Sequence, residues 1–323
     1  MSAFEAPRRP RTPARDTSAS WPLADRIGLA LCWAAGITLI LVAGAIVLFF
    51  AYKGITELQP SLLYERPTGD PDQSKAGGFL DPIVGTLMLT AIGTIIAVPI
   101  AVAVAIWLVE YGRPAPLARV VESGVEIIAG TPSIVLALFG LTVFSNTAFA
   151  FLSQSPEGTG AFGRSILISG VVMSIVALPL IVGATREALN TVPAHVREAS
   201  YALGKSKAAT VRRVLLPSIR PGIATGTALG MGRIIGDTAI VVILAGATLQ
   251  LEGSGSGIPF LQTLQGTGAT LTTYVYENSP AGEGNAPEKA YAAAAVLLVL
   301  VVLMNYVAAR IARGGREVQQ WSR

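Results

Sequence analysis

Residues 82–109 read PIVGTLMLTAIGTIIAVPIAVAVAIWLV and contain no aspartate, glutamate, lysine, arginine or histidine. A helix needs about 20 consecutive apolar residues to cross a bilayer, so this stretch is long enough. Hydrophobic residues make up 52% of the 323-residue chain and charged residues 14%, whereas a globular chain carries about 25% charge. The sequence therefore predicts an all-α, polytopic membrane protein. Four further runs lack the same five residue types: 27–52, 127–156, 165–185 and 290–309.

Six transmembrane helices are expected, and the first occupies 26–52. Its apolar run is longer than the core of a signal peptide, about 7–15 residues, and no small-residue cleavage pattern follows directly. We therefore expect a retained helix. The other five belong to a core over 80–311 and are expected at about 82–109, 120–152, 165–185, 221–249 and 290–309.

Basic residues are distributed unevenly among the connecting segments. The 24 lysines and arginines include 18 in four segments, with five in 1–26, two in 110–126, seven in 186–220 and four in 310–323. Because lysine and arginine favour the cytoplasmic side of a membrane, these segments and both termini are expected in the cytoplasm. This topology explains the isoelectric point of 9.3 without a nucleic-acid partner.

The remaining segments follow from that topology. The tail 1–25 is expected to be disordered, with its arginines on anionic membrane lipid, and 312–323 is expected to be a second cytoplasmic tail. The segments 53–80 and 250–288 would lie outside the cell and are long enough for short re-entrant or capping structure.

The composition offers few of the residues that catalysis or metal binding usually needs. The chain contains one cysteine and one histidine, Cys32 and His195. These numbers exclude a disulfide framework and a Cys/His zinc site within the chain. The sequence also lacks an HExxH motif, a Ser/His arrangement and paired carboxylates inside a span. We therefore expect no catalytic residue, no metal site and no cofactor in this chain.

The segment 186–220 carries its own helix signals. Asn190-Thr191 and Pro193 suit the start of a helix, and Gly204 suits its end. Ser206 would cap a second helix over Lys207–Leu216, which Pro217 would stop. Two short helices outside the membrane would form a docking surface for another protein. The alternative is a solvated basic loop that only follows the distribution of positive charge.

Gly204-Lys205-Ser206 superficially suggests a nucleotide-binding loop. A P-loop requires glycine five residues before Gly204, where this chain has Ala199, and a strand before it, where this chain predicts a helix. We therefore expect no ATPase activity in this chain.

The spacing within this segment matches a longer pattern. Glu198-Ala199-Ser200 is followed by three residues, Gly204, nine residues and Val214-Leu215-Leu216-Pro217. This arrangement resembles the EAA loop of ABC importer permeases, EAA-x3-G-x9-I-x-LP, with serine for the third alanine and valine for isoleucine.

Other stretches are similar to the phosphate-specific members of that family and most similar to the PstA-type subunit. The similarity covers about 80–310 and leaves out the N-terminal tail. An acidic residue, often glutamate, follows Gly236 in that family, so Asp237 is a small departure, and 250–288 matches no pattern. The stretches that carry the similarity are Glu110-Tyr111, Ala129–Val135, Leu138–Leu141, Arg197–Gly204 and Gly232–Ala239.

The resemblance implies a type I ABC importer permease fold in the bacterial inner membrane. It implies four kinds of partner: a second homologous permease, a dimer of ATPase subunits that bind ATP and magnesium, an external phosphate-binding protein, and lipid. The residues implied in contact with the ATPase are Arg197, Glu198, Ala199, Ser200, Gly204, Leu216 and Pro217.

Two charged residues, Arg233 and Asp237, interrupt the apolar span expected at 221–249. They stand four residues apart and would share a helix face. Gly222, Gly226 and Gly230 fall within about 80° of them at 100° per residue, so another helix could approach closely. Charges on such a face would point into the protein, a partner chain or a water-filled path rather than lipid.

Two interpretations of the pair compete, and we favour the second, a role in the substrate path, because ionisable residues inside a membrane are usually functional. It could be a neutralised ion pair that fixes helix packing. Alternatively, Arg233 could present its planar donor group to a tetrahedral oxyanion, with Asp237 holding the guanidinium and weakening its affinity. The hydroxyls of Thr131 and Ser133, beside Pro132, could line the same path or satisfy backbone groups that the proline frees; we favour the second role.

A different class of function is a self-contained secondary transporter. Arg233 and Asp237 would then form an anion and proton site, and the EAA-like loop would have no role. Within the importer interpretation, molybdate and sulfate are the alternative substrates to phosphate.

Overall fold

The computed structural model describes residues 22–68, 77–153, 163–246, 251, 259–280 and 282–313. Most of the two predicted cytoplasmic tails lies outside these residues, as do parts of both predicted external segments. The described chain is helical, and its only strand-like feature is an isolated bridge between Pro67 and Gly77. The prediction of an all-α protein is thus confirmed. The chain divides into two compact units, residues 1–49 and 50–323.

In the first unit, the described residues form most of one apolar helix. The helix α1 spans Leu23–Glu57, so it begins inside the predicted tail 1–25 and continues into the second unit. Its side chains in the first unit, such as Leu39 and Ile40, are exposed around the helix. A helix that is apolar on all sides is typical of a membrane span.

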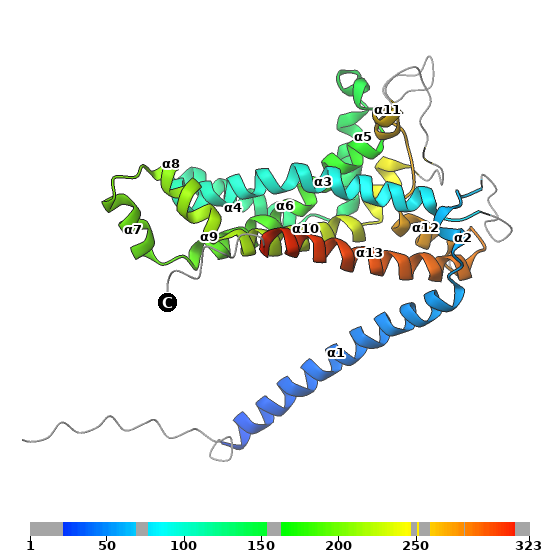
Figure 1. Cartoon of the computed structure of the whole chain (residues 1–323), viewed down its shortest axis with the longest axis horizontal. Helices are drawn as coiled ribbons and strands as arrows, with labels where there is room; N and C mark the ends of the chain where they lie inside the picture. Colours follow the sequence, from blue (N-terminus) through cyan, green and yellow to red (C-terminus); the bar gives the residue numbers. More distant parts are fainter. Residues whose placement is uncertain are drawn as a thin grey trace, which may run out of the picture. The chain divides into compact units, whose positions relative to one another are not determined.

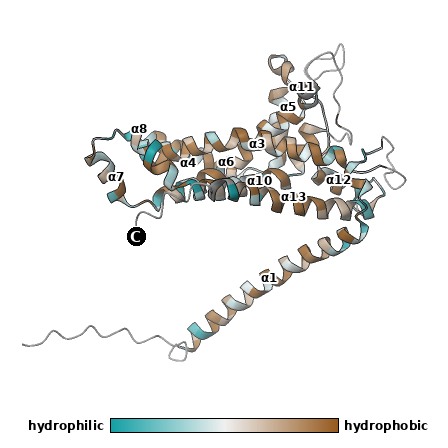
Figure 2. Cartoon of the chain, in the orientation of Figure 1, coloured by the Kyte–Doolittle hydropathy of each residue, from teal (hydrophilic) through white to brown (hydrophobic). Residues whose placement is uncertain are grey.

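Four helices form the body of the second unit: α3 (Leu80–Ile106), α6 (Ile166–Asn190), α10 (Arg220–Gly236) and α13 (Pro287–Arg313). α6 packs against α3 and α10, and α13 packs against α10 (Figure 1). Small residues permit close packing, and Ala97, Ala101 and Ala105 of α3 are completely buried. Figure 2 shows that hydrophobic residues dominate these helices.

Short elements lie at both ends of this body. α7 (Ala194–Ala202) and α8 (Lys207–Thr210) lie at one end, whereas α2 (Ser61–Tyr64) and α12 (Leu271–Asn278) lie at the other (Figure 1). The segments predicted to be cytoplasmic and external are therefore separated in space.

The predicted external segment 250–288 is partly built into the protein. Besides α11 (Pro259–Gln265), it contains α12, which begins with a capping box at Thr270 and packs against α13 and α3. Tyr274 of α12 is buried against Phe79, with ring centroids 5.7 Å apart. Burial raises the pKa of Tyr274 to about 12, so its phenol stays neutral.

The predicted third span, 120–152, is not one straight helix. α4 (Ala115–Gly130) and α5 (Ser133–Phe144) meet at an angle of 107°, and the 3₁₀ helix η3 (Thr147–Leu152) follows. The bend lies at Thr131-Pro132 because proline lacks an N–H and disfavours helical backbone in the residue before it. Thr131 is accordingly extended, with ψ 129°.

The predicted fifth span, 221–249, is also broken. α10 ends at Gly236, Asp237 is extended, and a short helical segment resumes at Ala239 and ends in the π-helix η5 (Val241–Ala245). Two contacts stabilise the break. The Asp237 carboxylate accepts a hydrogen bond from the Ile240 N–H, and Thr272 of α12 donates to the Ile235 carbonyl.

The number of spans follows from these breaks. Four described helices are long and apolar enough to cross a membrane, and the bent pair α4–α5 makes a fifth candidate. The predicted count of six is therefore not confirmed. The four helices are Leu23–Glu57, Leu80–Tyr111, Ile166–Asn190 and Pro287–Arg310, the second of which includes the π-helix η2 (Trp107–Tyr111).

The segment 186–220 differs from its prediction at two positions. α6 continues through Asn190, and Thr191 is its C-cap, so these residues do not cap α7; Pro193 precedes α7 without a side-chain cap. The second helical stretch runs through α8, the π-helix η4 (Val211–Leu215) and α9 (Leu216–Ser218), past Pro217. Pro217 lies in the first turn of α9, where a missing N–H is tolerated. Ser206 caps α8, as predicted.

Candidate functional site

Arg233 and Ser133 meet where α10 passes the start of α5. Arg233 lies in the last turn of α10, and its Nη2 donates a hydrogen bond of 2.6 Å to the Ser133 Oγ. The bend before α5 places Ser133 in the first turn of that helix. A contact between residues 100 apart in sequence therefore depends on the break at Pro132.

Asp237 contributes to this site from the break after α10. Its Oδ2 lies 3.4 Å from the Arg233 Nη2, and its Oδ1 accepts the hydrogen bond from Ile240. The Asp237 side chain is 3% exposed, whereas the Arg233 side chain is 43% exposed. The buried carboxylate thus satisfies a backbone group and partly neutralises an accessible guanidinium.

The guanidinium retains unused donors. A guanidinium has five N–H groups, and both contacts of Arg233 use Nη2. Within the described residues, no hydrogen bond is found for Nε or Nη1 of Arg233. The arrangement can therefore accept a further anionic ligand without losing the contact to Ser133.

The two hydroxyls beside Pro132 have different contacts. Thr131 donates from Oγ1 to the Ile127 carbonyl at 2.7 Å, which satisfies a backbone group at the end of α4. Ser133 instead accepts the bond from Arg233. We expected both hydroxyls to satisfy backbone groups near Pro132. Thr131 does so, whereas Ser133 contacts Arg233 instead.

The three glycines of α10 face α6. A Cβ atom at Gly226 would lie 3.0 Å from the Cβ of Ala184, and one at Gly230 would lie 2.8 Å from the Cδ1 of Ile181. A Cβ at Gly222 would collide with Ala188. Because these distances are too short for comfortable contact, α10 can lie this close to α6 only with glycine here.

α7 presents a second candidate site at the end of the body. Glu198, Ala199 and Tyr201 are exposed, and Leu203 after the helix is 78% exposed. Gly204 ends the helix with φ of +73°, in the region that favours glycine. The Gly204 and Lys205 N–H groups donate to the carbonyls of Tyr201 and Ser200, which completes a Schellman motif.

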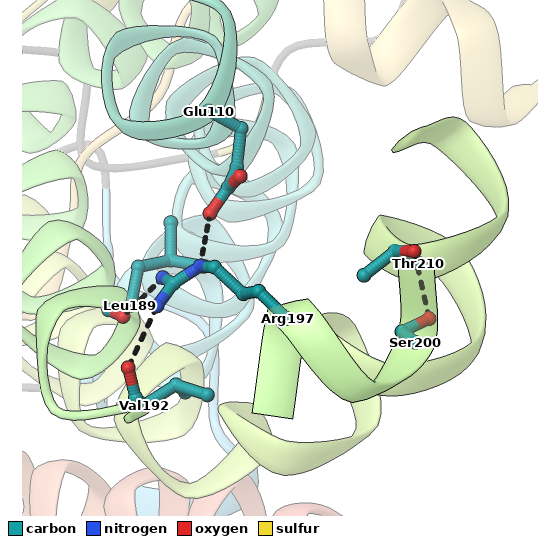
Figure 3. A network of polar contacts seen from close by, with 6 residues as sticks. All are labelled: Glu110, Leu189, Val192, Arg197, Ser200 and Thr210. Carbon is teal, nitrogen blue, oxygen red and sulfur yellow. Dashed lines mark hydrogen bonds and ion pairs between the residues drawn. The ribbon is translucent and has the colours of Figure 1, made fainter. Parts of the chain in front are cut away.

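Arg197 points inward from α7, as Figure 3 shows. Its Nε donates to the Glu110 Oε1 at 2.8 Å, its Nη1 to the Val192 carbonyl at 2.7 Å, and its Nη2 to the Leu189 carbonyl at 2.9 Å. The side chains of Arg197 and Glu110 are 20% and 6% exposed.

The other predicted coupling residues divide between the surface and the interior. Ser200 is buried and shares a hydrogen bond of 2.8 Å with Thr210 of α8 (Figure 3). Leu216 and Pro217 are partly buried. The sequence interpretation did not identify Glu110 or Thr210 as site residues. One feature of the sequence could have identified Glu110. It is the first charged residue after the uncharged run 82–109, so it lies where a helix of the body ends and can pair with an arginine such as Arg197.

Other kinds of site find little support among the described residues. They contain no group of three or more histidine, cysteine, aspartate or glutamate residues that could hold a metal ion. An apolar groove of about 740 Å³ lies between α3, α10 and α13, but its lining does not include Arg233 or Asp237. The polar chemistry is therefore concentrated at Arg233 and around α7.

The chain resembles known membrane components of importers. Residues 97–316 match the family "Binding-protein-dependent transport system inner membrane component". The chain is 32% identical to the phosphate transport system permease protein PstA 1 of Mycobacterium tuberculosis over 236 residues, which cover 73% of this chain and 71% of the relative. It is also 32% identical to PstC 1 of Mycobacterium bovis, over 72% of this chain and 71% of that protein.

Solved structures show the same fold. A chain of the inward-facing MetNI methionine ABC transporter matches with a TM-score of 0.55 and 22% identity, over 74% of this chain and 96% of that one. A chain of a bacterial alginate ABC transporter, in complex with a pentasaccharide-bound periplasmic protein, matches with a TM-score of 0.58 and 13% identity, over 92% of this chain and 96% of the other.

Proposed function

Since the chain belongs to the family of binding-protein-dependent transport system inner membrane components and is a permease subunit of an ABC importer, we propose that its substrate is inorganic phosphate. The similarity to both PstA and PstC proteins supports this substrate. An external binding protein would deliver phosphate, a second homologous permease would complete the path, and two ATPase subunits would drive transport.

The observation that carries the proposal is the accessible Arg233 with unused donors. A guanidinium offers parallel N–H groups that match two oxygens of a tetrahedral oxyanion. Asp237 reduces the net charge of the site, so the anion is bound weakly enough to leave. Ser133 adds a hydroxyl that can donate its own proton to a phosphate oxygen while it accepts from Arg233.

The surface next to Arg233 suits a second permease. The first turns of α5 expose apolar side chains that water would not favour, among them Ile134, Val135, Leu138 and Phe139, each more than half exposed. A second permease packed on this surface would close the other side of the path, so that Arg233 faces a passage between two chains rather than lipid.

The exposed face of α7 would dock on an ATPase subunit. Glu198 and Leu203 project from this face, while Arg197 and Ser200 hold the helix from within. ATP-driven closure of the ATPase dimer would then move α7. A secondary transporter needs no such surface, so the exposed face favours the ATP-driven alternative.

Phosphate uptake into vesicles tests the proposal. The vesicles would contain both permeases and the ATPase, with the binding protein added, and this chain would be wild type or carry Glu198→Arg. We expect ATP-dependent uptake with wild type and its loss with Glu198→Arg, because the reversed charge would repel the surface that accepts α7.

A matched control and two contrary outcomes complete the test. Glu65→Arg makes the same change on an exposed residue at the opposite end and should leave the ATPase bound. Normal uptake with Glu198→Arg would refute the role of α7 and favour an ion-driven transporter. Uptake of molybdate or sulfate in place of phosphate would refute only the substrate.

A further inference from the structure

Arg197 directs all three guanidinium nitrogens into the chain although it lies on the helix proposed to dock on the ATPase. Its three guanidinium nitrogens bond Glu110, Val192 and Leu189, at 2.8, 2.7 and 2.9 Å. Glu110 belongs to η2, the continuation of α3, while Leu189 is near the end of α6. One side chain therefore joins α7 to the ends of two helices of the body (Figure 3).

The Glu110 carboxylate is largely shielded from solvent. Its side chain is 6% exposed, and a buried carboxylate is stable as an anion only with a paired charge. Arg197 supplies that charge through a bond that is both ionic and directional, the strongest class of side-chain hydrogen bond. The pair thus resists displacement of α7 relative to η2.

Two neighbouring contacts support the same connection. The Lys207 Nζ lies 4.8 Å from the centre of the Tyr111 ring, so the start of α8 also contacts η2. Ser200 of α7 bonds Thr210 of α8 at 2.8 Å. α7 and α8 are therefore tied to each other and, at two points, to the end of α3.

The connection continues to the anion site through helix packing. α3 and α6 pack closely along the body, and α6 contacts α10 along the glycine face described above. Arg233 lies on α10. Packed helices therefore connect α7 to Arg233 without a gap.

We propose that Glu110 is a positioning residue for transport, and that its ion pair with Arg197 transmits the displacement of α7 to α3 and α6. This inference rests on the proposed function, in which the ATPase moves α7. Without the pair, α7 would still bind the ATPase through its exposed face. However, α7 would then move relative to α3 and α6 instead of shifting these helices and, through them, α10 with Arg233.

The test uses the complete assembly in proteoliposomes with the binding protein, and it measures ATP hydrolysis and phosphate uptake in the same sample. With Glu110→Gln, we expect the ATPase to remain bound and hydrolysis to continue, while phosphate moved per ATP falls at least about fivefold, a typical coupling between sites. A purely structural role would instead lower assembly and hydrolysis together with uptake.

A second pair provides the matched control. The pair of Glu122 and Arg186 joins α4 to α6 rather than α7 to the body, and both side chains are more exposed, 32% and 44%. Glu122→Gln removes the same charge and should leave the ratio of phosphate to ATP unchanged. Glu110→Asp keeps the charge but withdraws the oxygens, so it should give an intermediate ratio even if Glu110→Gln assembles poorly.

The outcomes separate the proposed role of the Arg197–Glu110 ion pair, called the tether here, from the proposed function. A wild-type assembly without ATP-driven phosphate uptake would overturn the proposed function and the tether's role with it. If wild type couples normally and both Glu110 variants keep a wild-type ratio, the tether alone is overturned. Loss of the ATPase from both Glu110 variants would reduce the pair to a structural contact and would also overturn the inference.

Discussion

Arg233 forms an ion pair with Asp237 and, within the described residues, still has N–H groups free to bind a ligand. Its partner Asp237 is buried and also bonds the Ile240 N–H, so the orientation of the carboxylate does not depend on the guanidinium alone. The ion pair is long, at 3.4 Å, whereas the bond to Ser133 is 2.6 Å. An anion bound at Arg233, as proposed, would therefore draw the guanidinium from Asp237 without breaking a short contact.

Arg233→Lys tests recognition by the guanidinium at the residue scale. Lysine keeps the charge but loses the planar donor pair, and a hydrogen bond to a charged group contributes about 1.5–3 kcal/mol. We expect phosphate uptake to fall by roughly 10- to 100-fold at limiting substrate. Uptake in vesicles containing the full assembly measures this effect.

Arg220→Lys is the control for that experiment. It makes the same change on an exposed arginine of the same helix, away from Ser133 and Asp237, and should leave uptake near wild type. Unimpaired uptake with Arg233→Lys would refute recognition by parallel donors and leave the pair a packing contact.

At the scale of elements, the contact between α6 and α10 determines where the candidate anion site lies. The glycine face lets α10 approach α6, and α12 then closes the end of α10 through the bond from Thr272 to Ile235. The same break that ends α10 releases Asp237 from helical geometry, which lets it cap the following turn. Packing, the helix break and the ion pair are thus parts of one arrangement.

Gly226→Ala tests this packing. The new Cβ would lie 3.0 Å from the Ala184 Cβ and 3.2 Å from the Ile181 backbone, so α6 and α10 must separate by a few tenths of an ångström. We expect a loss of about 1–3 kcal/mol in stability, the usual cost of overpacking, and a lower thermal unfolding temperature in detergent. Gly232→Ala is the control, because nothing lies within 4 Å of its Cβ and alanine favours a helix. Equal stability of the two variants would contradict the role of the glycine face.

At the scale of the whole molecule, α5 exposes an apolar surface that the rest of the chain does not cover. Phe139 is 65% exposed and Leu138 is 53% exposed, although α5 also contributes buried residues to the core. α5 therefore has one face for this chain and another for lipid or a partner. Its proximity to the Arg233 site favours the partner, because an exposed guanidinium facing lipid would be costly.

Phe139→Asp tests this surface. A charge there cannot be buried in a partner interface without a counter-ion, but it leaves the internal contacts of this chain intact. We expect the variant to insert and to lose copurification with the second permease. Phe151→Asp changes an equally exposed phenylalanine outside α5, on η3, and serves as the comparison. Retention of the second permease with Phe139→Asp would place the interface elsewhere.

The sequence by itself determined the class of protein and the placement of most helices. The cost of burying charge in lipid acts on continuous runs of residues, so the uncharged stretches reveal α1, α3, α6 and α13 without tertiary information. The end of α7 at Gly204 was equally local, because the left-handed residue that ends a helix is usually glycine.

Only the tertiary structure decided how the candidate sites are assembled. The bond between Arg233 and Ser133 joins residues 100 apart, and the pair of Arg197 and Glu110 joins residues 87 apart. Helical periodicity relates neighbours on one helix but not residues on two helices, so neither contact could be read from spacing. The break at Asp237 belongs to the same category, because an apolar run shows that a segment can enter a membrane but does not show that it stays straight. Pro132 marked a local weak point in the sequence, but the angle of 107° between α4 and α5 was visible only in the structure. Such a break is stable only where neighbouring groups satisfy the freed backbone, as Thr131 and Thr272 do here.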